Sequence, residues 1–244
     1  RKRFKEIRAL VRMVRAPLGH HYAVENGWFR DAGRDLAGAR DAAAVLESLA
    51  KLAKKKKLSR TTLRRTRALL TARRDTIASQ HLAERVATVL DQLVIAQARV
   101  ALWPTMDDSF DSVAAGLRRT YRRGRKAMVA AIERGMPRHF HEWRKLVKEQ
   151  WYHALLLRYV WPDMMKAWAG VLEELSRTLG DHHDLFVLRQ IVAASRQELG
   201  RRAAVVALLD AIESRQVELE QEALRIGALV YVERSTVRAW TGGR

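Results

Sequence analysis

Proline, which breaks helices, occurs only four times in the 244 residues of the chain. Between the prolines lie long stretches rich in Ala, Leu, Arg and Glu, in which apolar residues recur every three or four positions. This spacing is typical of amphipathic α-helices, and the alternating pattern of strands bounded by turns is essentially absent. We therefore predict an all-α fold, with helices at about 1–16, 22–36, 40–57, 60–76, 79–100, 108–134, 138–159, 163–179, 182–198 and 201–227 and a short last piece near 233–240.

Local signals mark the ends of helices in the second half of the chain. Pro162 is suited to the first position of a helix that begins after Trp161. Gly180 is typical of a helix stop, and Asp181, followed three residues later by Asp184, is typical of an N-cap. We therefore predict that one helix ends near residue 179 and that another begins near residue 182.

The chain resembles itself at an offset of 143 residues. The segment RKRFKEIR at 1–8 then falls on RKLVKEQW at 144–151 without a gap. We interpret this as two copies of one helical bundle, 1–107 and 108–244. The alternative is that helices rich in Lys and Arg resemble one another by composition. At this offset the first 50 positions hold ten identities, at Arg1, Lys2, Lys5, Glu6, Arg15, Gly27, Arg34, Leu36, Asp41 and Ala50.

The length and the composition of the chain limit the classes of protein to which it can belong. With 48% hydrophobic residues, the chain has enough apolar material for a sizeable core. It contains no cysteine, which excludes disulfides and thiolate metal sites. No run of about 18 uncharged apolar residues occurs, so we expect no transmembrane helix. The basic N-terminus lacks the apolar stretch of a secretory signal and begins as if inside a helix, so we expect residues upstream of it to be missing.

The charge of the chain is strongly unbalanced. Forty-six Lys and Arg face 27 Asp and Glu, which gives a net charge of +19. A charge of this size concerns the partners of a protein rather than its fold. The candidate partners are nucleic acid, an anionic membrane or another polyanion, and the excess of Arg over Lys suits bidentate contacts with phosphate oxygens.

The segment FHEWRKLVKEQWY, at 140–152, places five cationic or neutral polar side chains on one side of a helix. At 100° per residue they lie within an arc of about 100°, opposite an apolar seam that includes Trp143 and Val147. Like charges four residues apart destabilise a helix by a few tenths of a kcal/mol per pair, and we see no acidic side chain that compensates within the arc. The five residues are His141, Arg144, Lys145, Lys148 and Tyr152.

Two further segments carry one-sided positive charge. In GLRRTYRRGRKAM, at 116–128, Arg118, Arg122 and Arg125 share one face. We call each of these basic faces a stripe. For each stripe the alternative interpretation is an ordinary helix surface that faces solvent. If the two copies pack face to face, the stripes would line one groove, where a chain of phosphates would offset the repulsion and release counterions. The first helix gathers five basic side chains within about 80°, namely Arg1, Lys5, Arg8, Arg12 and Arg15.

Three other features have plainer interpretations. We expect KKKK at 54–57 and the arginines of 59–67 to form a flexible, solvated edge, although they could extend an anion track. The adjacent histidines of DHHD, at 181–184, cannot both face one metal from a regular helix, so we expect no metal site. His183, at the predicted helix N-terminus, would instead help to hold an anion. The seven tryptophans lie mostly among apolar positions, so we expect them in the core.

Together these motifs resemble the conserved histidine α-helical domain, CHAD. The resemblance covers nearly the whole chain and is carried by H-x-x-R-K-x-x-K at 141–148, its twin RKRFKEIR, YRRGR at 121–125 and LGDHHDL at 179–185. It implies two four-helix bundles, related by a pseudo-twofold axis, with a basic central cavity. It also implies binding of inorganic polyphosphate and, in bacteria, association with polyphosphate granules in the cytoplasm.

The resemblance also assigns residues to the binding site. The histidine that it implies for the first copy would precede Arg1, and Arg40 takes the place of His183, so the two copies differ chemically. His141 would add a donor that strengthens as the pH falls. With the stripes included, the predicted polyphosphate-binding residues are Arg1, Lys2, Lys5, Arg8, Arg12, Arg40, Arg118, Arg122, Arg125, His141, Arg144, Lys145, Lys148, Tyr152 and His183.

We therefore predict a non-enzymatic module that binds polyphosphate, or phosphate and sulfate ions in the same sites, with no cofactor and no membrane partner. Nucleic-acid binding is the alternative, but no helix-turn-helix, zinc-finger or RNA-recognition signature is present. Among the basic residues of the stripes, Tyr152 is the one aromatic residue that could stack on a base. An accessory role in polyphosphate metabolism with phosphatase activity ranks lower. The glutamates of VELEQE, at 217–222, would spread over different faces of a helix, and no P-loop pattern occurs.

Overall fold

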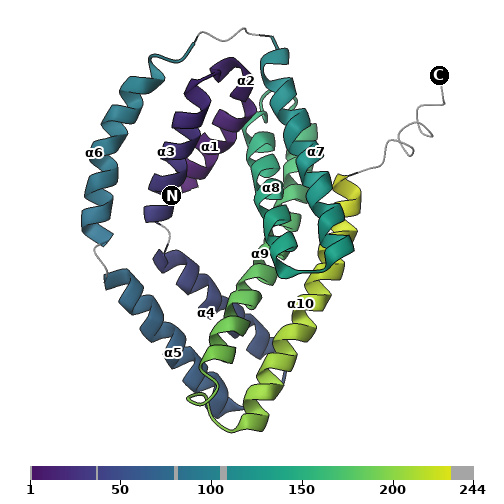
Figure 1. Ribbon diagram of the computed structural model, residues 1–244. Helices are drawn as coiled ribbons and strands as arrows, with labels where there is room; N and C mark the ends of the chain where they lie inside the picture. The colour runs from purple at the N-terminus through teal and green to yellow at the C-terminus, as the bar shows by residue number, and fades with distance from the viewer. Residues whose placement is uncertain (1, 37, 80–81, 105–108, 232–244) are drawn as a thin grey trace, which may run out of the picture. The chain divides into compact units, whose positions relative to one another are not determined.

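A computed structural model describes residues 2–36, 38–79, 82–104 and 109–231, without the side chains of 38–40, 78–79 and 82–83. Over these residues the chain forms helices and no strand, so the predicted all-α fold is confirmed. None of the described helices is long and apolar enough to span a bilayer. The helices are α1 (Lys2–Met13), α2 (Arg15–Leu18), α3 (His21–Asp35), α4 (Gly38–Lys55), α5 (Arg60–Ser79), α6 (Leu82–Val100), α7 (Asp111–Arg134), α8 (Pro137–Leu156), α9 (Pro162–Ala194) and α10 (Arg202–Val230) (Figure 1).

Most helix ends lie within a few residues of the predicted ones. The first predicted helix is divided, because α1 ends at Met13 and the short α2 follows it and ends at Leu18, just before Gly19, whose φ is +53°. Gly135, with φ of +58°, separates α7 from α8, which begins at Pro137. Glycine after a helix and proline at the start of the next are the residues favoured at these positions. The predicted helical piece near 233–240 lies outside the described residues.

The predicted helix end at Gly180 is wrong. α9 runs without interruption from Pro162 to Ala194, through both Gly180 and Asp181. Burying one large apolar side chain contributes about 1.5–3 kcal/mol, whereas a glycine inside a helix costs about 0.5–1 kcal/mol relative to alanine. Packing therefore overrides the local stop signal. Apolar side chains are buried at helical spacing on both sides of the glycine, at Leu172, Leu175, Leu179, Leu185, Leu188 and Val192.

The chain divides into two compact units. The first comprises 1–116 and 184–216, and the second comprises 117–183 and 217–244. α7, α9 and α10 therefore each contribute to both units. The predicted copies 1–107 and 108–244 were drawn from the repeat in the sequence rather than from packing, and they stay a prediction.

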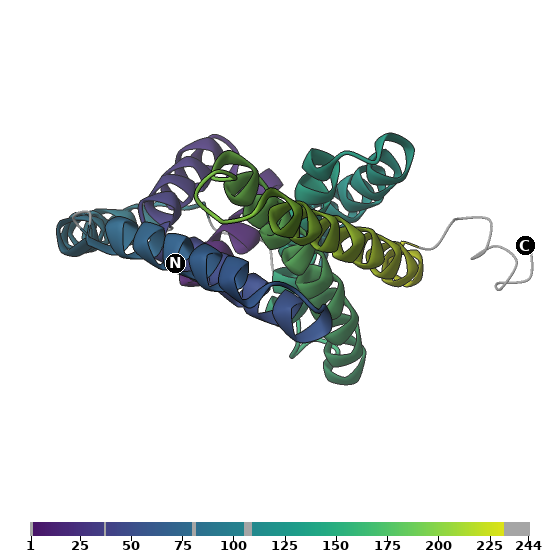
Figure 2. The same cartoon turned by 90° about the horizontal axis from the view of Figure 1, so that it is seen from below.

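In the first unit, α1 packs against α3, and α4 packs against α5 (Figures 1 and 2). The ring of Phe4 on α1 lies 6.1 Å from the rings of both Trp28 and Phe29 on α3. Val89 and Ala96 of α6 belong to the same buried cluster. α1 is thus held against α3 by an aromatic contact that α6 covers.

An ion pair joins α6 to α3 within the first unit. Arg99 donates from Nε to Glu25 Oε1 at 2.8 Å and from Nη2 to Glu25 Oε2 at 3.2 Å. The Glu25 side chain is only 2% exposed, and its hydrogen bonds raise the pKa of Arg99. Because a buried carboxylate without a partner is strongly destabilising, this bidentate contact ties the two helices together in one register.

In the second unit a hydrophobic core surrounds Trp143 of α8, whose side chain is fully buried. Val147 of α8, Leu175 of α9 and Ile226 of α10 belong to the same cluster. Gly227 of α10 faces the indole so closely that an added Cβ would come within 2.6 Å of Trp143 Cζ2. The indole therefore fixes how closely α8 and α10 approach each other.

The helix bounds can be compared at the offset of 143. Shifted by that number, α3 falls on 164–178 and α4 on 181–198, both largely within α9. α5 falls on 203–222, within α10. α3, α4 and α5 thus have helical counterparts in the same order in the second half, except that the counterpart of α3 and α4 is one continuous helix. The pseudo-twofold arrangement of two bundles stays a prediction.

Candidate functional site

The basic stripe of α8 lies on the side of the helix away from Trp143. Lys145 is exposed, and His141, Arg144 and Lys148 are half-buried. Trp143 points in the opposite direction and is fully buried. We refer to the four residues His141, Arg144, Lys145 and Lys148 as the α8 stripe.

The placement of Tyr152 on this face is wrong. Its side chain is only 3% exposed, and its ring lies 4.9 Å from that of Trp151. The helical arc places Tyr152 among the cations, but the arc does not tell where along a helix a face becomes covered. Near its C-terminal end α8 is covered on most sides, and the residues buried there are Glu149, Gln150, Tyr152, His153 and Ala154.

An acidic side chain beside the α8 stripe, Glu142, compensates one of its charges, which the helical arc did not predict. Lys145 Nζ lies 2.6 Å from Glu142 Oε1, and the two side chains are 54% and 61% exposed. An exposed ion pair of this kind contributes about 0–1 kcal/mol. Lys145 is therefore partly neutralised, and Arg144, next to it, is the stronger candidate for an anion contact.

Two contacts join the α8 stripe to α9. The rings of His141 and His183 lie 4.3 Å apart, and Arg144 lies over Gly180, where an added Cβ would be 3.6 Å from Arg144 Nε. The prediction that His183 begins a helix is wrong, because α9 continues through it. Arg144 Nε and His141 Nδ1 are both buried atoms with no hydrogen-bond partner among the described residues.

The protonation of His141 is opposed by its surroundings. Burial lowers its pKa below the usual value of 6.5, and the charges of Lys145 and Arg144 lower it further. Glu142 acts in the opposite direction but does not outweigh them. The surroundings of His141 therefore favour its neutral form, and a bound anion would favour its charged form.

His182, next to His183, has a structural partner. It is 1% exposed, and its Nε2 lies 2.9 Å from Glu220 Oε1 on α10. The ring of Phe140 on α8 lies 5.0 Å from the ring of His182. Of the two adjacent histidines, one is thus held in the packing of α9 against α8 and α10, while the other lies against the α8 stripe.

A hydrogen-bonded network fixes α7 against α8. Thr120 Oγ1 donates to Glu149 Oε1 at 3.2 Å, and Gln150 Nε2 donates to the Thr120 carbonyl at 3.2 Å. Tyr231, whose pKa is raised by burial, donates its hydroxyl to Gln150 Oε1 at 2.9 Å. Gly124 faces this network and leaves room for it. The buried side of α7 is therefore set by Thr120 and Gly124, and the opposite side is left to solvent.

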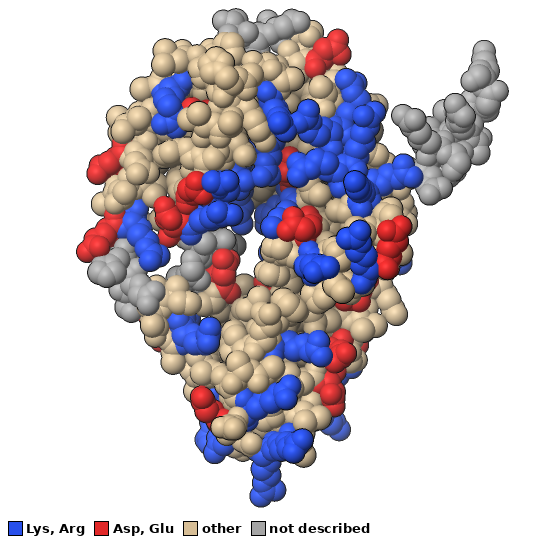
Figure 3. Space-filling model, viewed as in Figure 1, with Lys and Arg blue, Asp and Glu red and all other residues tan. Residues whose placement is uncertain are grey.

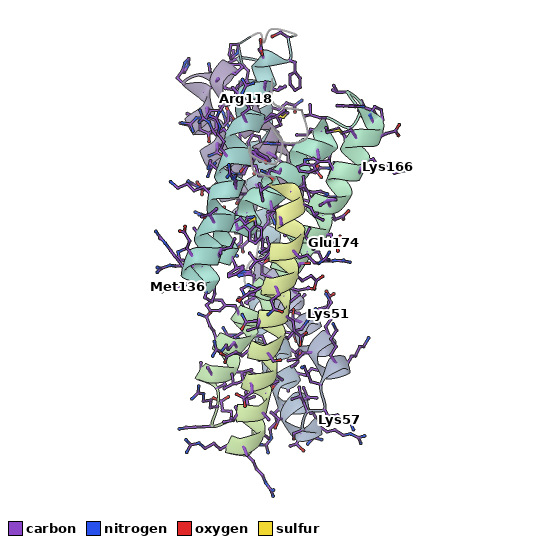
Figure 4. The ribbon with its side chains drawn as sticks, turned by 90° about the vertical axis from the view of Figure 1, so that its right-hand side faces the viewer. Lys51, Lys57, Arg118, Met136, Lys166 and Glu174 are labelled. Atoms are coloured by element: carbon purple, nitrogen blue, oxygen red, sulfur yellow. The ribbon has the colours of Figure 1, made fainter. Side chains whose placement is uncertain are left out.

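That opposite side of α7 carries a continuous row of cations (Figure 3). Arg118 and Arg122 are exposed and Arg125 is half-buried, while Arg119, Arg123 and Lys126, which were not among the predicted site residues, are exposed as well. No acidic residue occurs between 112 and 132. Arg118 is labelled near one end of α7 and Met136 just beyond the other (Figure 4). We refer to Arg118, Arg119, Arg122, Arg123, Arg125 and Lys126 as the α7 ridge.

We refer to the basic residues predicted on the first helix as the stripe of α1, although Arg15 lies in α2. The five residues are Arg1, Lys5, Arg8, Arg12 and Arg15, and two of them contact side chains of α3. Arg12 donates from Nε to Asn26 Oδ1 at 3.2 Å, and the guanidinium of Arg15 lies 4.5 Å from the centre of the Tyr22 ring. Of the remaining predicted residues, Lys2 is exposed, whereas Lys5 and Arg8 are half-buried. Two of the predicted binding groups lie outside the described residues, namely Arg1 and the side chain of Arg40.

The CHAD domain family model matches residues 1–193 of the chain. The chain belongs to the CHAD domain family. The matched residues include the stripe of α1, the α7 ridge, the α8 stripe and His183. No curated protein and no solved structure matches the chain at a significant level.

Within the second unit of this CHAD domain, predicted site residues from three helices are connected. The α8 stripe contacts His183 of α9, and α8 is hydrogen-bonded to α7, which carries the α7 ridge. The stripe of α1 belongs to the first unit. Its convergence with the α8 stripe into one basic cavity stays a prediction.

Carboxylates and imidazoles come together in this CHAD domain as pairs. His182 with Glu220 is one pair, and His141 with His183 is another. Over the residues that the structure describes, no group of three or more such side chains is placed to hold a metal ion. The guanidinium, ammonium and imidazole groups of the α7 ridge and the α8 stripe can bind anionic oxygens.

Proposed function

We propose that this CHAD domain binds inorganic polyphosphate through the α7 ridge and the α8 stripe, without cleaving it, and associates with polyphosphate granules in the cytoplasm. The observation that carries the proposal is the α7 ridge, in which six cationic side chains follow one another over 118–126 with no acid among them. The general association of CHAD domains with polyphosphate supports the same ligand.

The spacing of the α7 ridge suits a linear polyanion. At a rise of about 1.5 Å per residue, Arg118 and Arg122 stand about 6 Å apart along the helix axis, and Arg122 and Arg125 about 4.5 Å. A chain of phosphates that runs along the helix can therefore meet a guanidinium at each step and accept bidentate hydrogen bonds from it. Bound phosphate would also remove the repulsion between like charges four residues apart.

The α8 stripe supports the proposal through two polar atoms that lack a hydrogen-bond partner. Arg144 Nε and His141 Nδ1 are buried without a hydrogen-bond partner among the described residues. A polar atom in this state costs about 1–3 kcal/mol, which an accepting oxygen would return. A phosphate oxygen over this part of α8 would satisfy Arg144 directly, and it would favour protonation of His141.

The test compares two sets of arginines with the same spacing. Arg118→Gln, Arg122→Gln and Arg125→Gln together remove three charges from the α7 ridge. The matched control is the triple change at Arg60, Arg64 and Arg67, which are exposed on α5 with the same four- and three-residue spacing. We expect the ridge variant to bind long-chain polyphosphate at least tenfold more weakly, since charged hydrogen bonds contribute about 1.5–3 kcal/mol each. Equal losses in the two variants would show that net charge alone attracts the ligand.

The α8 stripe is tested in the same assay. Arg144→Ala, Lys145→Ala and Lys148→Ala together should also weaken binding by at least tenfold, since they remove the cations next to His141. A triple Lys-to-Ala change at Lys54, Lys55 and Lys57, which are exposed, serves as the control. Unchanged affinity in the α8 variant would remove this stripe from the proposed site.

Two further measurements separate the proposal from its rivals. If duplex or single-stranded DNA displaced long-chain polyphosphate easily at fixed salt, nucleic acid would be the better ligand. Release of phosphate from tripolyphosphate in the presence of Mg²⁺ would show catalysis and contradict the non-enzymatic part. Glu220, one of the glutamates of 217–222 that we weighed for phosphatase activity, lies 2.9 Å from Nε2 of the buried His182, which supports a structural role for it.

A further inference from the structure

Large apolar side chains are exposed together where α8 leads into α9. The exposed fractions are 79% for Tyr159, 70% for Val160, 61% for Trp161 and 48% for Met164. All seven residues of 158–164 are exposed. The expectation that the tryptophans lie in the core is therefore wrong for Trp161. We refer to residues 158–166 as the α8–α9 tip.

The corresponding turn in the first half of the chain is built differently. At the offset of 143, Trp161 falls on Leu18 of α2, whose side chain is 0% exposed. Leu18 belongs to a cluster with Val11, against which Trp103 and Val113 pack. A turn at this point of the helix order can therefore bury its apolar residue. The exposure of Trp161 is a property of the second half and not a requirement of the turn.

Cations flank the apolar residues of the α8–α9 tip on both sides. The guanidinium of Arg158 lies 4.6 Å from the centre of the Tyr159 ring, and its Nη2 donates to the Tyr159 hydroxyl at 2.7 Å. Lys166 is exposed on the first turns of α9 (Figure 4). Asp163 is the one acidic residue of 158–166, and it lies in the first turn of α9, where the helix dipole favours a negative charge.

We propose that the α8–α9 tip contacts the surface of anionic phospholipid bilayers. Tyr and Trp combine an apolar ring with a polar group and are the residues enriched at the headgroup level of membranes. Lys and Arg beside them pair with anionic headgroups, and the net charge of +19 attracts the whole chain to such a surface. The sequence analysis named an anionic membrane among the candidate partners for the charge but predicted no membrane partner, and a peripheral contact of this kind needs no spanning segment.

The observations favour a bilayer surface over a protein partner. Arg158 precedes and Lys166 follows the exposed apolar residues in the sequence, and the guanidinium of Arg158 lies against the Tyr159 ring. That combination matches the order of headgroup and hydrocarbon at a bilayer surface. The proposal does not depend on polyphosphate binding, because none of the α8–α9 tip residues belongs to the α7 ridge or the α8 stripe.

The first experiment measures binding of the full chain to vesicles by sedimentation. We expect binding to vesicles of phosphatidylcholine mixed with phosphatidylserine, and weaker binding to phosphatidylcholine alone. Tyr159→Ser with Trp161→Ser should lower the partition coefficient about tenfold or more, since each buried aromatic contributes a sizeable apolar term. Val24→Ser, at a residue that is 59% exposed on α3, is the matched control and should leave binding unchanged. Asp163→Asn should strengthen binding to the anionic vesicles.

A charge control separates the α8–α9 tip from the α7 ridge. The variant with Arg118→Gln, Arg122→Gln and Arg125→Gln should lose vesicle binding mainly at low salt, because the attraction of the α7 ridge to anionic lipid is screened at high salt. If that variant abolished binding while Tyr159→Ser with Trp161→Ser had no effect, the contact would belong to the ridge and the proposal would be overturned. Absence of binding by the unaltered chain would overturn it as well.

A second experiment asks whether Trp161 enters the bilayer. Lipids with brominated chains quench tryptophans that insert. Trp161→Phe keeps an apolar ring, so it should retain partitioning and lose most of the quenching. Quenching that is unaffected by Trp161→Phe would place other tryptophans at the bilayer and overturn the proposal. Light scattering measures the oligomeric state of the variant with Tyr159→Ser and Trp161→Ser. If that variant changed its oligomeric state and bound vesicles as the parent chain does, the α8–α9 tip would be a protein contact and the proposal would be overturned.

Discussion

Gly124 shows how one missing side chain positions the α7 ridge. An added Cβ there would collide with the Tyr231 hydroxyl and lie 2.9 Å from Gln150 Nε2. Those two groups belong to the network that binds α7 to α8 through Thr120. The same glycine that admits this network on the buried side leaves the arginines on the other side directed to solvent.

Gly124→Ala should therefore destabilise the protein. We expect a loss of about 1–3 kcal/mol in the free energy of unfolding, because the methyl group must displace hydrogen-bonded partners that are buried. Urea denaturation measures the loss. The control is Gly170→Ala on α9, where nothing lies within 4 Å of the added Cβ. That change should stabilise the helix by about 0.8–1 kcal/mol. A Gly124→Ala variant as stable as the parent chain would contradict the packing described for α7.

His141 should make polyphosphate binding depend on pH. In the free protein its pKa is lowered by burial and by Lys145 and Arg144. A bound anion would raise that pKa, so protons would be taken up on binding and the affinity would increase as the pH falls through about 6.5 and below. Titration of affinity against pH, with His141→Gln as the comparison, measures the effect. Equal pH profiles for the two proteins would exclude His141 from the linkage.

In the protein without ligand, His141 makes the stability of the fold decrease as the pH falls, whereas the affinity for polyphosphate should increase. Because the folded pKa of His141 is lowered, the unfolded chain binds the proton more readily. Its contribution to stability is therefore present above the unfolded pKa of about 6.5 and is lost as the pH falls. Polyphosphate would reverse this trend, which makes the effect of pH on stability a second way to see the ligand.

At the scale of single helices, α9 shows that packing can override local signals for a helix end. Its glycine and aspartate at 180–181 predict a helix end, and its buried apolar residues on both sides of that point keep it continuous. The continuity places His183 beside His141 and lays Arg144 over Gly180. The contact between α8 and α9 in the candidate site thus depends on a helix that local signals would have broken.

Gly180→Ala tests the continuity of α9. The added Cβ would lie 3.6 Å from Arg144 Nε, which is an ordinary contact distance. Since alanine favours a helix over glycine by about 0.8–1 kcal/mol, the variant should be as stable as the parent chain or more stable by up to about 1 kcal/mol. A glycine that ended a helix in the left-handed region would behave differently, and alanine there would reduce stability. A clear loss in thermal or urea unfolding would therefore count against the continuous helix.

At the scale of the whole molecule, the net charge of +19 couples ligand binding to stability. Like charges repel within the compact state, and a polyanion reduces that repulsion. Any ligand that binds only the folded chain also stabilises it by mass action, by about 2.7 kcal/mol at a concentration one hundred times the Kd.

Long-chain polyphosphate should therefore raise the thermal unfolding midpoint more than orthophosphate at the same total phosphate concentration. The difference arises because only the chain can engage several arginines of the α7 ridge at once. Differential scanning calorimetry at fixed ionic strength measures it. The variant with Gln at 118, 122 and 125 should show a smaller increase. Equal shifts with both forms of phosphate would indicate independent ion sites rather than a track for a chain.

Much of this protein was predictable from its sequence, because the relevant signals are local. Helical periodicity and the scarcity of proline indicate the all-α fold, and the motifs at 141–148 and 179–185 indicate the CHAD family. The one-sided charge of α7 and α8 follows from the angle between successive residues, which every regular helix shares.

The tertiary structure decided what local signals leave open. It kept α9 continuous through Gly180 because burial outweighs the helix propensity of one residue. It buried Tyr152, although the helical arc places it among cations, and it exposed Trp161, although tryptophan is commonly a core residue. It also separated the adjacent histidines of 182–183 by role, one bound to Glu220 and one beside His141. The physical reason is the same in each case, since the energy of a side chain depends on which other helices cover it.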